Sequence, residues 1–130
     1  MVSLLTGGCA VWLAPTARAD ESVTYEVASN DISVADIEYF DGHAQQALHD
    51  APLPWRTTVT IADPRSLGAH GAEVRTDWRP NHVPVGPLGA PALAGKWVTV
   101  RIYFGDKVRC ENTLDVGDAA CHGATPFNNT

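Results

Sequence analysis

The chain has 130 residues, a length that suits one domain with a modest core. It carries 9 Lys and Arg side chains against 15 Asp and Glu, which gives a net charge of −6 at pH 7. Such an acidic surface repels phosphate backbones, so the composition excludes nucleic acid as an expected partner.

The first 19 residues have the pattern of an export signal. A short apolar run leads to Ala17-Arg18-Ala19, which places small residues at the two key positions of a cleavage site before Asp20. No Lys or Arg precedes the run, so the usual basic start of a signal is missing, and a buried strand or short helix is the alternative. The run is shorter than the roughly 20 residues that a membrane-spanning helix needs. We expect a signal peptide over 1–19 and an exported, soluble single domain over 20–130.

Cys9 allows a second interpretation of this segment. Leu5-Thr6-Gly7-Gly8-Cys9 resembles a bacterial lipoprotein box, in which the Cys is acylated and anchors the protein. Thr6 stands where such boxes usually have Leu, which favours loss of Cys9 with the signal. The remaining pair, Cys110 and Cys121, would then lie in an oxidising compartment, and we expect a disulfide between them.

Alternating apolar and polar residues predict a series of short strands. Asp41-Gly42 supplies a natural hairpin turn after the second strand. Ala44 to His49 stays open between a strand and a single helical turn. This pattern of short strands and tight turns is typical of an all-β sandwich or barrel. The expected strands cover 21–27, 34–40, 55–61, 72–78, 97–104, 107–112 and 118–121.

A stiff entry precedes the third of these strands. Pro52 and Pro54 fix their own φ angles and favour extended conformations at the residues before them, so the segment cannot be helical. From Trp55 to Ile61, apolar residues and Thr methyl groups alternate with polar ones. We expect a strand with one buried face here.

Residues 62–96 break the strand rhythm with many Pro and Gly residues, and the best candidate for a long exposed loop lies around 79–96. Loops of this length in compact domains are usually functional or mobile. Trp55, Trp78 and Trp97 favour a core role at their strand positions. The sharper alternative is that Trp78 lines a groove, with a candidate binding surface made of Trp78, Arg79, Asn81 and His82.

No catalytic or metal-binding motif is recognisable in the chain. Asp36 and Glu38 project from one face of a strand, as general acid and base groups would, but also as the solvated face of an edge strand would. None of the five His residues shows the spacing that metal ligands favour. We therefore expect no enzyme activity, no metal and no cofactor. The His residues are His43, His49, His70, His82 and His122.

Several short motifs in order resemble the MmpS family of mycobacterial membrane-associated proteins. They are Val23-Thr24-Tyr25-Glu26-Val27, Ile37-Glu38-Tyr39-Phe40-Asp41 and Ala51-Pro52-Leu53-Pro54-Trp55, with a weaker block at Thr99-Val100-Arg101-Ile102 and Gly105-Asp106-Lys107-Val108 and a late Cys121. The resemblance implies an immunoglobulin-like β-sandwich of about seven short antiparallel strands. It also implies a non-catalytic protein of the actinobacterial cell envelope, acting outside the cytoplasmic membrane.

The family's members are accessory to large RND-type exporters of lipids and siderophores. The resemblance thus implies an adaptor whose partner is an RND-type membrane transporter or another envelope protein, with a lipid or siderophore as cargo. The runner-up is a soluble carrier that holds a small hydrophobic ligand between the sheets or under the 81–95 loop.

Three departures from the family pattern stand out. Val100 occupies the place of the family's first Cys, so a bond from Cys110 would staple the last hairpin instead. The family's single transmembrane anchor is replaced here by a short run with a cleavage site. The segment from Ser66 to Lys96 is also longer than its counterpart in the family.

Overall fold

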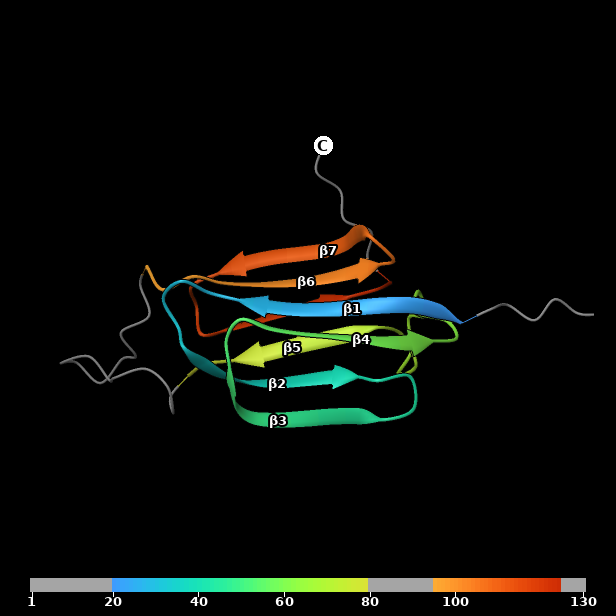
Figure 1. Cartoon of the computed structure of the whole chain (residues 1–130), viewed down its shortest axis with the longest axis horizontal. Helices are drawn as coiled ribbons and strands as arrows, with labels where there is room; N and C mark the ends of the chain where they lie inside the picture. Colours follow the sequence, from blue (N-terminus) through green and yellow to red (C-terminus); the bar gives the residue numbers. More distant parts are fainter. Residues whose placement is uncertain (1–19, 80–94, 125–130) are drawn as a thin grey trace, which may run out of the picture.

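The computed structural model describes residues 20–79 and 95–124, and these residues form eight β-strands and no helix. The strands build two antiparallel four-stranded sheets that face one another, which confirms the predicted all-β sandwich (Figure 1). The strands are β1 (Glu21–Ala28), β2 (Val34–Phe40), β3 (Gln45–Pro52), β4 (Trp55–Ile61), β5 (Glu73–Asp77), β6 (Val98–Phe104), β7 (Lys107–Leu114) and β8 (Asp118–His122).

Sheet A has the strand order β4-β1-β6-β7, and sheet B has the order β3-β2-β5-β8. The eighth strand beyond the expected seven is β3, which settles the open choice at Ala44 to His49 in favour of a strand. β3 is an edge strand in which only Ala51 is buried, so its sequence shows little of the apolar alternation that marks a strand. The edges of the two sheets are β4 and β7 in sheet A and β3 and β8 in sheet B.

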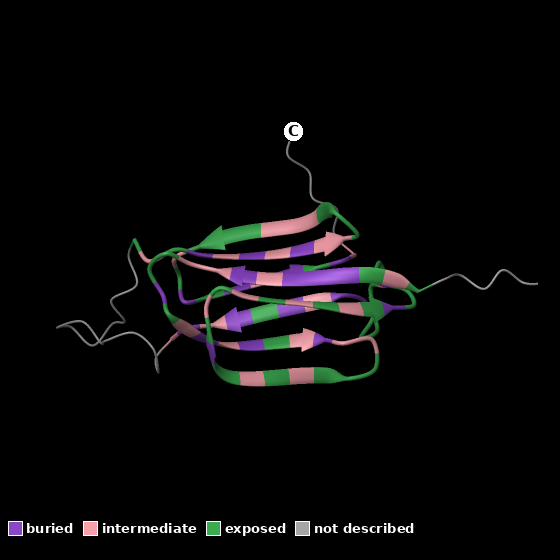
Figure 2. Cartoon of the chain, in the orientation of Figure 1, coloured by how far each residue is buried: buried purple, intermediate pink, exposed green. Residues whose placement is uncertain are grey.

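The core lies between the sheets, and on β5 and β6 the buried residues alternate with less buried ones, as Figure 2 shows. On β6 the predicted alternation is confirmed, since Val98, Val100 and Ile102 are fully buried. Tyr25 joins the two layers, because its hydroxyl donates to the Phe40 carbonyl at 2.7 Å and accepts from the Glu73 amide at 3.2 Å.

The proline stretch carries the chain from sheet B to sheet A. It links the end of β3 to the start of β4, and the Leu53 amide donates to the Ser33 carbonyl at 2.9 Å. Trp55 is partly buried, and its ring lies 5.2 Å from that of Tyr39. The predicted strand with one buried face is confirmed in β4, where Ile61 is buried and Arg56 is exposed.

Cys110 and Cys121 form a disulfide, with 5.7 Å between their Cα atoms. The expectation that it would staple a hairpin is wrong. Cys110 lies on β7 at the edge of sheet A, whereas Cys121 lies on β8, which pairs with β5 at the edge of sheet B. The bond therefore ties the two sheets together along one side of the sandwich, while the short β3–β4 link joins them along the other.

Trp55, Trp78 and Trp97 do not share one environment, so the expected tryptophan core is only partly correct. Trp78 is fully buried, Trp55 is intermediate, and Trp97 is 48% exposed. Trp97 precedes β6, on the outward-facing side of its alternation. Its amide donates to the Asp31 carboxylate at 3.0 Å, and its carbonyl accepts from the Ser29 hydroxyl.

Candidate functional site

The predicted binding surface at Trp78, Arg79, Asn81 and His82 is not assembled as expected. Trp78 continues the inward face of β5, where Val74 and Thr76 are also buried, so its side chain cannot line an open groove. Its indole nitrogen has no hydrogen-bond partner among the described residues. Asn81 and His82 lie outside the described residues. Of the two described residues, only Arg79 is accessible, and its side chain lies against a different surface.

That surface is the outer face of sheet B. Strand register places Asp36 of β2 opposite Asp77 of β5, and Asp77 opposite Asp118 of β8. Directly opposed residues in antiparallel strands have Cβ atoms roughly 5 Å apart, so the three carboxylates form one row across three strands. The guanidinium of Arg79 lies 3.5 Å from Asp77 and 4.0 Å from Asp118.

The row borders a hollow of about 320 Å³ on this face. Glu38 from β2 and His49 from β3 also line it, and the His49 ring nitrogen lies 3.6 Å from the Asp36 carboxylate. We call these five side chains, Asp36, Glu38, His49, Asp77 and Asp118, the acidic face. Arg75 also lines the hollow, and Arg79 pairs with Asp77, so the four carboxylates are only partly offset and the surface stays acidic, which favours contact with a cationic group of a partner.

The predicted pair Asp36 and Glu38 does lie on one face, but its surroundings are those of a surface cluster. Asp36 also accepts a hydrogen bond from the Asp50 amide at 3.1 Å. Glu38 is exposed and lies opposite Arg75 of β5. The pair thus belongs to the charged outer surface of sheet B.

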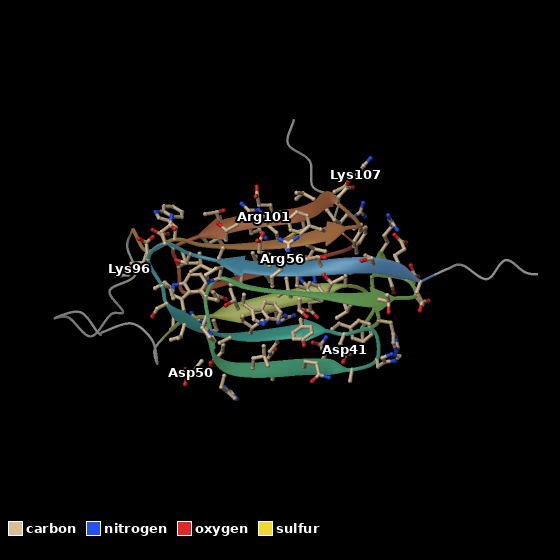
Figure 3. All side chains as sticks on the ribbon, viewed as in Figure 1. Asp41, Asp50, Arg56, Lys96, Arg101 and Lys107 are labelled. Atoms are coloured by element: carbon tan, nitrogen blue, oxygen red, sulfur yellow. A yellow bond between two sulfur atoms is a disulfide. The ribbon has the colours of Figure 1, made fainter. Side chains whose placement is uncertain are left out.

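Sheet A carries an ionic row of its own. Arg56 of β4, Glu26 of β1, Arg101 of β6 and Glu111 of β7 lie in register across all four strands, and Figure 3 shows both arginines over this sheet. Glu26 accepts from Arg101 and Tyr103 at 3.1 and 2.9 Å. Partial burial opposes ionisation of Glu26, but these hydrogen bonds outweigh it and lower the pKa of the carboxyl. Here opposite charges alternate, so the row is neutralised internally.

The histidines are dispersed over the sandwich. His43 lies in the β2–β3 turn, His49 on β3, His70 in the β4–β5 connection and His122 on β8. His82 lies outside the described residues. In the part of the chain that the structure describes, no group of three or more His, Cys, Asp or Glu residues is arranged to hold a metal ion.

Sequence reasoning identified Asp36 and Arg79 but missed the acidic face. Asp77 and Asp118 are ordinary outward positions of two strands that lie about 40 residues apart along the chain. Only the register of β5 against β2 and β8 brings them together, and a single sequence does not reveal that register. The available signal was an Asp near the end or start of each of the three strands.

Comparison with known proteins shows a match to one protein family. The model of the family described as Mycobacterium membrane protein matches residues 15–77, a segment that ends with the last residue of β5. No curated protein matches the chain. Within residues 20–79 and 95–124, no helix has the length and apolar character needed to cross a membrane. The matched segment contains all three of the MmpS-like motifs around Tyr25, Tyr39 and Trp55, so over residues 15–77 the chain is similar to this mycobacterial membrane protein family, in agreement with its resemblance to the MmpS family.

Proposed function

We propose that this protein is an exported, non-catalytic binding domain of the mycobacterial cell envelope, an adaptor for an RND-type membrane transporter. The family-model match over residues 15–77 supports association with the envelope. The observation that carries the adaptor role is the acidic face. Asp36, Asp77 and Asp118 give sheet B a charged outer surface that a basic patch on a partner would complement.

The alternative, a carrier of a small hydrophobic ligand, has less support. A ligand held between the sheets needs room there, but the inner faces are occupied by large buried side chains such as Trp78, Tyr25 and Ile37. The hollow on sheet B is bordered by five charged side chains beside a few small apolar ones, which suits a protein surface better than an apolar ligand. A ligand under the 81–95 loop would involve residues outside the described ones.

Affinity purification from a mycobacterial host tests the adaptor role. The tagged full chain is expressed with Asp36→Asn and Asp118→Asn, which remove two charges but keep the side-chain size. We expect an RND-type transporter to copurify with the wild type and much less with this variant. Neutralising the exposed Asp63 and Asp106 at one end of the sandwich provides a charge-matched control, which should retain the transporter.

Two results would overturn this assignment. Equal recovery of the transporter by the wild type and the acidic-face variant would remove the acidic face as the contact surface. One lipid molecule per protein in mass spectra of the purified chain, with no transporter recovered, would favour the carrier. An enzyme would instead show an activity that Asp36→Ala or Glu38→Ala abolishes while the circular dichroism spectrum stays unchanged.

A further inference from the structure

A second surface, unrelated to the acidic face, lies at the end of the sandwich where β1 begins. The Gly105 amide in the β6–β7 turn donates to the Ser22 carbonyl at 3.0 Å, and Glu21 pairs in register with Ile61, so this end also holds the connection that follows β4. A groove of about 490 Å³ opens here. We call it the basic groove, and it is lined by Ser22, Arg65, Phe104, Lys107, Val108 and Arg109, with Glu21 at its border.

Two arginines contact one aromatic ring in this groove. The guanidinium carbons of Arg65 and Arg109 lie 4.6 and 5.4 Å from the centre of the Phe104 ring, within the range of cation–π contact. Arg109 also donates from its Nε to the Gly123 carbonyl at 2.7 Å. These contacts hold the Arg109 side chain in place, and its two terminal amino groups form no hydrogen bond within the described residues.

The charge balance inside the groove is unusual for this protein. Arg56, Arg65, Arg75, Arg79 and Arg101 each form an ion pair with a carboxylate. Among the described residues, neither Lys107 nor Arg109 has a carboxylate within ion-pair distance. Two uncompensated cations therefore share one groove on a chain whose net charge is −6.

The groove also has an apolar component. Phe104 lies at its base, and Val108, on the same strand as Lys107 and Arg109, is 38% exposed. Leu67, two residues after Arg65, is 93% exposed. Paired cations next to exposed aliphatic side chains match a ligand with a phosphate group and an attached hydrocarbon portion.

We propose that the basic groove binds the phosphate group of an anionic phospholipid, with Lys107 and Arg109 as the phosphate ligands and Phe104 and Val108 against the adjoining glycerol and acyl carbons. Arg65 supports the site through its contact with Phe104, and the ion pair with Glu21 neutralises the charge of Arg65. Lys107 extends outward at the tip of the β6–β7 hairpin, in a position to reach a headgroup at a membrane surface (Figure 3). The site would operate whether or not the acidic face contacts a transporter.

Vesicle flotation of the full chain tests this proposal. Phosphatidylcholine vesicles are compared with vesicles that also contain phosphatidylglycerol, so that the apolar run in residues 1–19 contributes to both measurements and the difference reports on charge. We expect tighter binding to the anionic vesicles, which high salt weakens. Lys107→Gln with Arg109→Gln should reduce this preference by about thirtyfold, as two cations near an anionic surface would.

A matched control separates the groove from overall charge. Lys96→Gln with Arg75→Gln removes the same charge at other places on the sandwich and should keep the preference for anionic vesicles. Circular dichroism should show that both double variants remain folded. The proposal fails if the wild type does not distinguish the two vesicles, or if the control loses as much as the groove variant. Binding of inorganic phosphate by calorimetry without any binding to anionic vesicles would also overturn it, because the source would then be a free anion.

Discussion

Tyr25 is the residue whose polar group connects the two sheets inside the core. Its side chain is fully buried, and burial raises the pKa of the phenol well above its ordinary value of 10, so the hydroxyl stays protonated and acts as a donor. The same oxygen accepts from the Glu73 amide on β5. A neutral hydroxyl therefore satisfies one carbonyl and one amide from different strands of sheet B.

Tyr25→Phe should lower the free energy of unfolding by about 1–3 kcal/mol, because it leaves both backbone partners without the hydroxyl. Urea unfolding followed by fluorescence measures this. Tyr39→Phe is the matched control, since the Tyr39 hydroxyl makes no hydrogen bond within the described residues, and it should change stability by less than about 0.5 kcal/mol. Equal effects of the two substitutions would show that the Tyr25 hydroxyl does not support the fold.

Glu26 makes stability depend on pH in a defined direction. Its pKa in the folded protein is lower than the ordinary 4.5, so its ionised form stabilises the fold above that pH, and the contribution is lost as the pH falls through the folded-state pKa. Glu26→Gln should cost about 1–2 kcal/mol at neutral pH, because the partners Arg56 and Arg101 are partly solvated.

The difference in unfolding free energy between the wild type and Glu26→Gln should therefore shrink as the pH falls from neutral through the lowered pKa of the Glu26 carboxyl, where it becomes protonated. Urea titrations at several pH values measure that difference. A constant difference across this range would mean that the hydrogen bonds to Glu26 do not depend on its charge.

At the scale of single residues, the sequence predicted side-chain direction well where the chain alternates. The buried positions of β6 and β4 follow directly from a period of two. It predicted the burial of Trp78 correctly but that of Trp97 wrongly, because tryptophan's preference for burial applies on average, whereas strand phase decides each position. Trp78 continues the inward phase of β5, and Trp97 lies on the outward phase of β6.

At the scale of elements, the disulfide links an edge strand of sheet A covalently to an edge strand of sheet B. It closes a loop of modest length in the unfolded chain and should contribute on the order of 2–3 kcal/mol. We expect the thermal midpoint of the wild type to fall on reduction, and the double variant Cys110→Ala with Cys121→Ala to show that lower midpoint with or without reductant. A reductant effect that persists in the double variant would exclude the disulfide as its cause.

The strands themselves were largely predictable, since turns at Asp41-Gly42 and Gly105-Asp106 follow alternating segments. What a single sequence could not predict was how the strands pair. β8 follows β7 along the chain and was therefore expected beside it, yet it pairs with β5 in the other sheet. The same pairing builds the acidic face, so the disulfide geometry and the candidate site were missed for one physical reason: non-local register is not encoded in local periodicity.

At the scale of the whole molecule, the sandwich separates its charges. The acidic face lies on the outer side of sheet B, sheet A carries a row of alternating opposite charges, and the basic groove lies at the end where β1 begins. The two proposed contacts, a basic protein partner at the acidic face and an anionic lipid at the basic groove, use separate surfaces. This arrangement is consistent with the similarity of residues 15–77 to a mycobacterial membrane protein family.

The predicted signal peptide has a direct test at this scale. Mass spectrometry of the exported protein should give a chain that starts at Asp20 and contains one disulfide, with Cys9 removed. Retention of residues 1–19, or a mass that includes acyl chains on Cys9, would instead show that the protein stays anchored to the membrane.

Site-specific photocrosslinking in a mycobacterial host tests the central claim most directly. A photoreactive amino acid is placed at Ala47, which lines the hollow on sheet B, and separately at Thr58 on the outer side of sheet A. We predict that the Ala47 position crosslinks to an RND-type transporter and that the Thr58 position does not. Crosslinking from Thr58 alone, or from neither position while the protein is exported and folded, would contradict an adaptor that binds through the acidic face.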